Sequence, residues 1–176
     1  VHTMTISVIM SVYRNERPEY LDESIRSIWT DQTVKPAEII LIKDGPLTDA
    51  LERTISTWKE RIGDRLITHS NGTNLGLTKS LNIALRLASS DLIARMDSDD
   101  LSDPRRFERQ TAFLEANPDV AIVGGAMQEF NSSNPKLNVR HYPRNNDEVM
   151  RTIYKASPLA HPTVMMRSAI FRNGLK

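Results

Sequence analysis

Residues 5–12 read TISVIMSV, and this run decides the fold class. Its isoleucine, valine and methionine residues do not alternate strictly with polar ones, which is typical of a parallel strand buried on both faces. The stretch after Pro18 then places apolar residues at helical spacing, among them Ile25 and Ile28. The chain is therefore expected to begin with a buried strand and an amphipathic helix.

The same alternation of strand and helix patterns continues along the chain. Further strands are predicted at residues 38–43, 65–69, 91–96 and 120–123, with helical stretches between them, one of which starts at Pro104. Residues 131–146 are polar and rich in turn formers. Repeated β–α units predict an α/β fold, with a Rossmann-like, mostly parallel sheet, right-handed crossovers and helices on both faces.

The composition limits the classes of function. The 176 residues suit one domain, and 23 basic against 22 acidic side chains leave a formal charge of +1, so general nucleic-acid binding is not indicated. Cysteine is absent, which excludes disulfides and thiolate metal sites and fits a reducing compartment such as the cytoplasm. No apolar run approaches the ~20 residues that span a bilayer.

The clearest functional signal is the segment DLIARMDSDDLSD at residues 91–103. Asp97, Asp99 and Asp100 follow a strand-like run directly, and such close carboxylates repel one another unless a hard divalent cation lies between them. The ends of strands in α/β sheets are also where these folds bind ligands. The segment predicts a metal-assisted site for a phosphate-bearing substrate, with a solvated acidic turn as the alternative.

Polar residues follow the first four predicted strands in the same way. They lie at 13–16, at Asp44, at 71–76 and at 97–100. Because parallel strands end at one edge of a sheet, these four groups are expected to meet there. Each group alone is ordinary turn chemistry, and it is their coincidence that indicates a site.

Five segments, in this order and spacing, resemble family 2 glycosyltransferases of the GT-A fold: SVIMSVYRNE, IILIKDG, NLGLTKSLNIAL, ARMDSDD and LAHPTVMMR. The resemblance covers nearly the whole chain. It implies an inverting hexosyl or related transferase that moves a sugar from a nucleotide donor, usually a UDP-sugar. The acceptor would be a saccharide or a lipid-linked saccharide, in the synthesis of bacterial surface polysaccharide. The non-enzymatic alternative is a module that binds nucleotide-sugar or polysaccharide without chemistry.

Carried over to this chain, the resemblance assigns these nucleotide-binding residues: Ser11, Val12, Tyr13, Glu16, Asp44, Asn74, Gly76, Lys79 and Asp97. Asp44 would accept a hydrogen bond from an N–H of uracil, and a charged acceptor strengthens that bond. Its alternative role is to open an Asp-Gly turn. Lys79 would meet phosphate, or would be an ordinary surface lysine.

The DSDD segment matches the DxD motif of the family. By that match Asp99 is a direct metal ligand and Asp97 reaches the metal, its water or the ribose. Asp100 and His161 would support the site, although a histidine before proline is as often structural. Mg²⁺ or Mn²⁺ would bridge the diphosphate and stabilise charge on the leaving nucleotide.

The chain departs from the family pattern at the general base, a carboxylate expected downstream of the LAHPTVMMR segment. Residues 173–176 offer no counterpart, and Glu129, Asp147 and Glu148 are interpreted as structural, the last two at the start of a helix. We therefore expect residues 1–176 to form a single donor-binding domain, truncated before the base and weak or inactive alone. A lipid-linked acceptor would place it at the inner face of a membrane, as a peripheral protein.

Other site classes fit the acidic segment less well. An EF-hand loop starting at Asp97 would have Leu101 at its fifth position and Ser102 where glycine is required. A dehalogenase-type phosphatase would carry its DxD near the first strand, and a pyrophosphorylase would need a glycine-rich loop there, whereas residues 11–18 contain no glycine. No GxGxxG motif follows a strand, which disfavours a dinucleotide enzyme.

Overall fold

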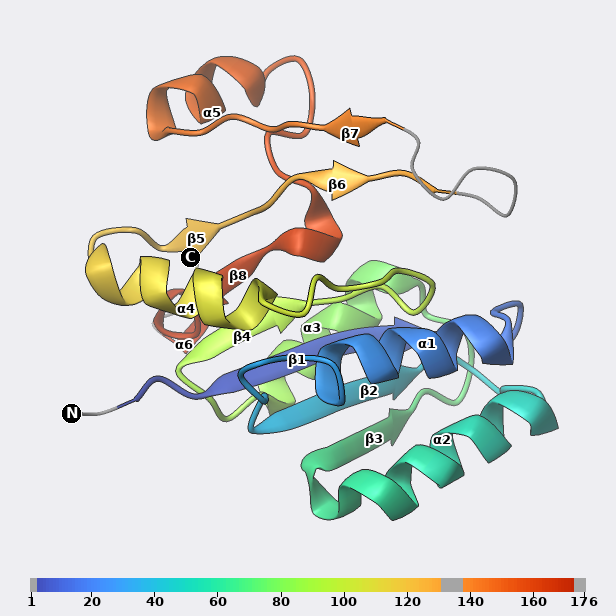
Figure 1. Ribbon diagram of the computed structural model, residues 1–176. Coiled ribbons are helices and arrows are strands. Elements are labelled where there is room, and N and C mark those ends of the chain that lie inside the picture. The colour runs from blue at the N-terminus through green and yellow to red at the C-terminus, as the bar shows by residue number, and fades with distance from the viewer. Residues whose placement is uncertain (1–2, 131–137, 173–176) are drawn as a thin grey trace.

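A six-stranded sheet forms the centre of the computed structural model, which describes residues 3–130 and 138–172 (Figure 1). Its strands are β1 Ile6–Val12, β2 Glu38–Lys43, β3 Leu66–Ser70, β4 Leu92–Arg95, β5 Ile122–Val123 and β8 Met165–Arg167. The spatial order is β3-β2-β1-β4-β8-β5. Neighbours among β3, β2, β1 and β4 pair in parallel, whereas β8 runs antiparallel to β4 and β5.

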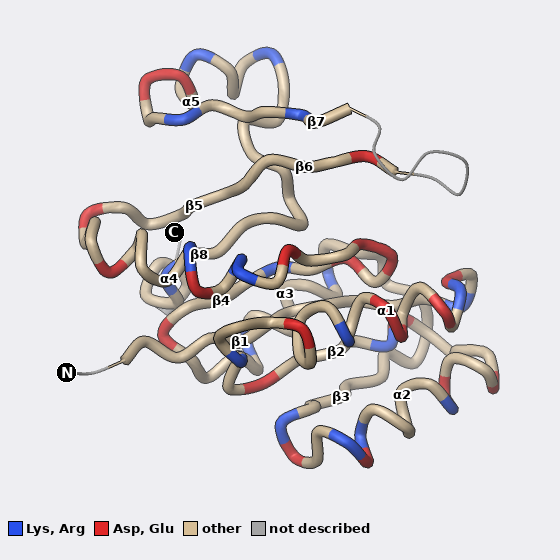
Figure 2. Tube along the Cα trace, in the orientation of Figure 1, with Lys and Arg blue, Asp and Glu red and all other residues tan. Residues whose placement is uncertain are grey.

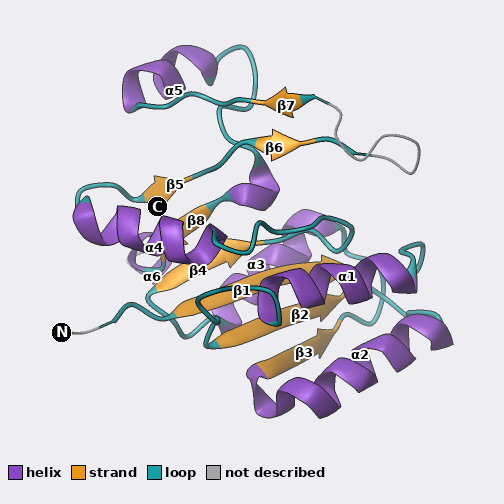
Figure 3. Cartoon of the chain, viewed as in Figure 1, coloured by secondary structure: helices purple, strands orange, loops and turns teal. Residues whose placement is uncertain are grey.

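Helices cover both faces of the sheet (Figure 3). They are α1 Pro18–Trp29, α2 Asp49–Ile62, α3 Leu77–Leu87, α4 Arg106–Ala116, α5 Asn146–Thr152 and α6 Ala169–Arg172. Buried residues of α1, α2 and α4 pack with Val8 and Met10 of β1 on one face. On the other face Ala84 of α3 packs with Ile9 and Ile40. This alternation along β1 explains its apolar run, because residues of both parities are buried.

The predicted α/β class and the mostly parallel sheet are confirmed, with differences at the C-terminal side. The three-residue strand β8 was not predicted, because so short a run carries little periodicity. The strand expected at 120–123 is confined to Ile122–Val123, and the helix expected from Pro104 begins at Arg106. Within the polar stretch 131–146, residues 131–137 lie outside the described part of the chain.

A second, smaller antiparallel pair lies beside α5, away from the main sheet (Figure 1). It joins β6 Met127–Gln128 to β7 Val139–Arg140. Both signs of charge are distributed along the described chain (Figure 2), in keeping with the formal charge of +1. In the described ranges, no helix has the length and apolar character needed to cross a membrane.

The order of the strands decides where a ligand can bind. β1 has β2 on one side and β4 on the other, and the chain crosses from β3 to β4 through α3. The carboxyl ends of β1 and β4 therefore flank the point where the strand order reverses, which is where open α/β sheets bind ligands. The loops after these two strands contain residues 13–17 and 96–105.

Candidate functional site

The loops after β1 and β4 are joined directly by a hydrogen bond. The Ser98 hydroxyl donates to Oε2 of Glu16 at 2.8 Å, and the other carboxylate oxygen of Glu16 accepts from the Arg17 N–H at 2.9 Å. A turn closes the first loop, where the Glu16 N–H donates to the Tyr13 carbonyl at 3.0 Å. Two of the four predicted groups of polar residues are thus brought together at the switch point.

The second pair of groups meets at Asp44, which follows β2 and is only 5% exposed. Its Oδ1 accepts from Asn71 Nδ2 at 2.9 Å and from the Leu75 N–H at 2.7 Å, and its Oδ2 accepts from the Gly76 N–H at 3.0 Å. Gly45 has φ +88°, and a Cβ there would lie 2.9 Å from the Asn74 nitrogen. Asp44 therefore does more than open a turn: it holds the loop after β3 against the end of β2.

Burial raises the pKa of Asp44, but the hydrogen bonds from Asn71 and from the Leu75 and Gly76 N–H groups outweigh it and hold the pKa below its ordinary value of 3.8. A folded-state pKa below the unfolded value means that the charged form stabilises the fold. This contribution is fully present above about pH 3.8 and is lost as the pH falls through the lower folded value.

Replacing Asp44 with asparagine is expected to lower the unfolding free energy by about 2 kcal/mol at neutral pH. The new amide NH₂ would face the Gly76 N–H, from which Oδ2 now accepts a hydrogen bond. Urea unfolding followed by circular dichroism measures the loss. The gap between wild type and variant should narrow below about pH 3.8. Asp119→Asn, at an exposed position in the turn before β5, is the matched control and should cost under about 0.5 kcal/mol. Equal losses in the two variants would contradict this role for Asp44.

The remaining nucleotide candidates lie at the same edge. Ser11 and Val12 end β1, and the Val12 carbonyl accepts from the Asp44 N–H at 2.8 Å. Gly76, with φ +87°, precedes α3, and Lys79 is exposed in the first turn of that helix. The N-cap residue Gly76 has no side chain that could bond the first N–H groups of this helix, which starts at the edge where phosphate is expected.

The acidic cluster lies immediately after β4, as predicted. Asp99 is exposed, whereas Asp97 and Asp100 are half-buried. Oδ1 of Asp97 lies 2.8 Å from Nη2 of Arg95. Burial raises the pKa of Asp97, an effect that Arg95 opposes and the charge of Asp99 reinforces. Burial and the charges of Asp97 and Asp99 raise the pKa of Asp100 to about 6.

This cluster has the chemistry of half a metal site. Its carboxylates carry mutually repelling charge, and a divalent cation beside them would favour their charged forms. Among the described residues, no three His, Cys, Asp or Glu side chains are placed to hold a metal by themselves. Mg²⁺ in phosphate-transfer sites takes only one or two protein carboxylates and completes its shell with water and substrate phosphates. The oxygen ligands present therefore fit a cation that is completed by a diphosphate.

Two arginines lie close to the acidic cluster, and neither was predicted as a site residue. Arg95 is 7% exposed, pairs with Asp97 through Nη2, and has a buried Nε without a partner in the structure. Arg106, in the first turn of α4, donates Nη2 to the carbonyls of Arg95 at 2.8 Å and Val164 at 3.1 Å. Burial lowers the pKa of Arg106 to about 10, and the charges of Asp100 and Asp97 oppose that shift. Arg106 therefore stays charged near neutral pH, and the charges of both arginines act on the carboxylates of the cluster.

His161 begins the 3₁₀ turn His161–Thr163, and its side chain is exposed. The turn lies against the end of β4, because the Arg95 N–H donates to the Val164 carbonyl at 3.0 Å. His161 also contributes to the electrostatics of Asp97, whose pKa it lowers. The structure thus brings His161 to the acidic cluster from a segment far along the chain.

The carboxylates interpreted as structural have partners of their own. Glu129 forms an ion pair with Arg140 across β6 and β7. Glu148 accepts from the Arg144 N–H at 2.9 Å, and its own N–H donates to the Asn145 side chain at the start of α5. Asp147 is exposed in the first turn of that helix, where its negative charge interacts favourably with the helix dipole.

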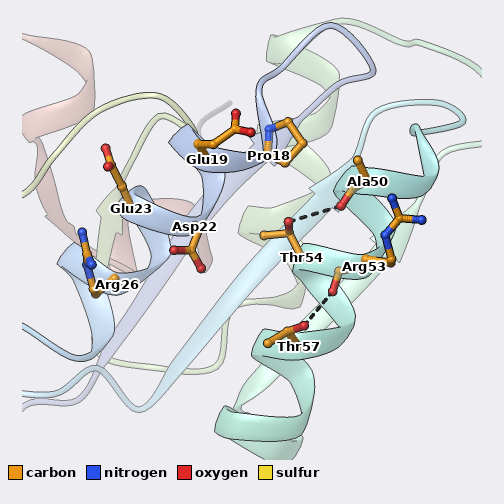
Figure 4. A pocket seen from close by; sticks show the side chains of 9 residues that line it. All are labelled: Pro18, Glu19, Asp22, Glu23, Arg26, Ala50, Arg53, Thr54 and Thr57. Atoms are coloured by element: carbon orange, nitrogen blue, oxygen red, sulfur yellow. Dashed lines mark hydrogen bonds between the residues drawn. The ribbon is translucent and has the colours of Figure 1, made fainter. Parts of the chain in front are cut away.

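The structure also has a groove elsewhere, between α1 and α2 (Figure 4). It has a volume of about 460 Å³ and is lined by Pro18, Glu19, Asp22, Glu23, Arg26, Ala50, Arg53, Thr54 and Thr57. None of these residues belongs to the acidic cluster or to the loop after β3. Two of its threonines already bond within α2, Thr54 to the Ala50 carbonyl and Thr57 to that of Arg53. We place the site at the sheet edge, where opposed charges and loops converge.

Comparison with known sequences gives a match to the family model "Glycosyl transferase family 2" over residues 7–174. The chain is 33% identical to the amylovoran biosynthesis glycosyltransferase AmsE of Erwinia amylovora, over 92% of this chain and 59% of that protein. It is 34% identical to the UDP-Gal:alpha-D-GlcNAc-diphosphoundecaprenol beta-1,3-galactosyltransferase of Escherichia coli, over 94% and 59%. The chain therefore spans about three fifths of the length of these curated relatives.

Among solved structures, Staphylococcus aureus TarS 1–349 in complex with UDP-GlcNAc has a TM-score of 0.74 at 23% identity, covering 97% of this chain and 47% of TarS. The mannosyltransferase PcManGT from Pyrobaculum calidifontis, in complex with GDP-Man and Mn²⁺, has a TM-score of 0.61 at 22% identity, covering 70% and 36%. At these identities the likeness concerns the fold, and it confirms the predicted GT-A architecture.

Proposed function

Because this chain belongs to glycosyl transferase family 2, we propose that it forms the donor site of an inverting glycosyltransferase that uses a UDP-sugar and Mg²⁺ or Mn²⁺. One observation carries the proposal: the acidic cluster lies at the β1–β4 switch point and is tied to the loop after β1 through Ser98 and Glu16. The carboxylate oxygens at that edge would hold a divalent cation, and the cation would supply positive charge to a bound nucleotide diphosphate.

In this proposal Asp99 is the direct metal ligand, since it is the exposed member of the cluster, and Asp97 contacts the metal shell or the ribose. Asp100 supports them. When bound, the cation stabilises negative charge on the departing diphosphate. The end of β1 with Ser11 and Val12, the following loop with Tyr13 and Glu16, and the start of α3 line the nucleotide. Lys79 supplies positive charge near phosphate. Asp44 holds the loop that presents Gly76, and its Oδ2, which accepts one hydrogen bond in the structure, would accept a second from an N–H of uracil.

We assign no general base among the described residues, because Glu129 pairs with Arg140 and Glu148 is engaged at the start of α5. We therefore expect this chain alone to transfer sugar poorly while still binding nucleotide. Chromatography of donor and product over a long incubation would check this, and robust turnover would contradict it.

The names of two relatives support the proposed acceptor: one is an amylovoran biosynthesis glycosyltransferase, and the other is a galactosyltransferase named for a GlcNAc-diphosphoundecaprenol. The proposal includes a saccharide acceptor, which is free or linked to a lipid diphosphate. It also includes a location in the cytoplasm at the inner face of the membrane.

Calorimetric titration of UDP tests the nucleotide and the metal together. In Mn²⁺ or Mg²⁺ we expect UDP to bind, GDP to bind at least about tenfold more weakly, and EDTA to abolish the heat of binding. Folding is checked on the same sample by circular dichroism. A folded sample that binds UDP in neither ion would overturn the UDP-sugar assignment, and a preference for GDP would replace it with a guanosine donor.

A further inference from the structure

The loop that carries the acidic cluster is irregular from Met96 to Arg105, so its shape depends on contacts with the rest of the chain. Many of those contacts come from α1 and the residues just after it. Ser24 and Ser27 of α1, and Gln32 and Thr33 just beyond it, all bond to this segment.

Gln32 is central to this arrangement. It is 2% exposed, and its Nε2 lies 2.8 Å from the Ser27 carbonyl, 2.8 Å from the Asp103 carbonyl and 3.1 Å from the Ser102 hydroxyl. Its Oε1 accepts from the Phe107 N–H at 3.2 Å. One buried amide thus joins the end of α1 to both the acidic loop and the start of α4.

Three further hydrogen bonds connect α1 and the segment after it to the same loop. The Ser24 hydroxyl donates to the Asp97 carbonyl at 2.8 Å, the Ser102 N–H to the Ser27 hydroxyl at 3.0 Å, and the Thr33 N–H to the Pro104 carbonyl at 2.9 Å. All three of these bonds, like the bond from Gln32 to the Asp103 carbonyl, reach the main chain of the loop. None of them uses a carboxylate oxygen of Asp97, Asp99 or Asp100.

We propose that Gln32 is a positioning residue, which holds residues 97–107 in the shape that presents Asp97, Asp99 and Asp100 to the metal and diphosphate. The like charges of the cluster push the loop apart, and a satisfied buried amide network opposes that force. Since α1 starts directly after the nucleotide loop that contains Glu16, it couples the two halves of the site. The proposal rests on the proposed function for its ligand but not for its geometry.

Two variants test the role. Gln32→Glu has nearly the same shape but places an oxygen against the carbonyls of Ser27 and Asp103, and Gln32→Met removes both polar groups. Ile55→Ala, a buried position in α2 remote from the loop, supplies a destabilised control. Each protein is studied well below its own unfolding temperature, as judged by circular dichroism.

The first measurement is hydrogen exchange, which needs no ligand. In the Gln32 variants we expect peptides covering residues 98–107 to lose at least about tenfold in protection, while those covering β1 and β2 keep theirs. The second is the affinity for UDP in Mn²⁺, which should fall at least about tenfold in both variants and stay unchanged in Ile55→Ala.

The outcomes separate the two proposals. Loss of loop protection together with loss of affinity supports the positioning role. Unchanged exchange at residues 98–107, or UDP affinity equal to wild type in both Gln32 variants, overturns it. If the wild-type protein fails to bind UDP in either ion, the proposed function fails, and exchange alone then decides whether Gln32 holds the loop.

Discussion

Replacing Arg106 with methionine is expected to lower the unfolding free energy by about 3–5 kcal/mol, the largest stability effect we anticipate in this protein. Its guanidinium bonds to the carbonyls of Arg95 and Val164 and, through Nε, to Gln110 Oε1 at 3.1 Å. Methionine fills similar space but removes a hydrogen-bond donor from each of these acceptors, and it takes away one of the two arginine charges that act on Asp100.

Urea unfolding at neutral pH measures this loss, and Arg105→Met is the matched control. Arg105 is adjacent in sequence but exposed, and its Nε lies 3.2 Å from Glu108 in a surface ion pair, so its loss should cost under about 1 kcal/mol. Similar stabilities of the two variants would show that Arg106 is not an internal counter-charge.

Replacing Asp99 with asparagine is expected to weaken metal-dependent UDP binding by about 100-fold or more, because it removes the negative charge from the proposed direct ligand. Stability should hardly change, since Asp99 is exposed and repelled by its neighbours. The Asp99 substitution is thus expected to lower affinity but not stability, whereas the Arg106 substitution lowers stability, and this contrast separates the site from its support.

Calorimetry in saturating Mn²⁺ gives the affinity of the Asp99→Asn variant. Asp119→Asn makes the same change of charge before β5, at the opposite end of the strands, and should bind UDP like wild type. If both variants lost affinity equally, the effect would come from net charge and not from metal ligation.

Most of the fold could be predicted from the sequence, because its core elements are long and their apolar residues follow clear patterns. The strand β1 is a long apolar run, the apolar residues of α1 and α2 recur at helical spacing, and the predicted strand 38–43 matches β2 in the structure. Short elements gave weaker signals. β8 has three residues and enters the sheet between β4 and β5, a placement decided by contacts across the sheet.

The same limit applies to the site. The acidic cluster and the strand-end loops were predictable because parallel strands end at one edge. The support of Arg95, Arg106 and Gln32 was not, since it consists of bonds between residues far apart in sequence, such as the 71 positions between Gln32 and Asp103. A lone glutamine three residues past a helix carries no local signature, although its burial decides its importance.

The central claim is that the cation and diphosphate bind at the β1–β4 edge. Paramagnetic broadening of backbone amide signals by substoichiometric Mn²⁺, with and without excess UDP, tests it most directly. We expect UDP-dependent broadening at Asp99, Asp100 and Gly76, with sharp signals at Thr54 and Thr57 in the groove between α1 and α2 (Figure 4). Broadening at Thr54 and Thr57 that spares Asp99 and Gly76 would contradict it.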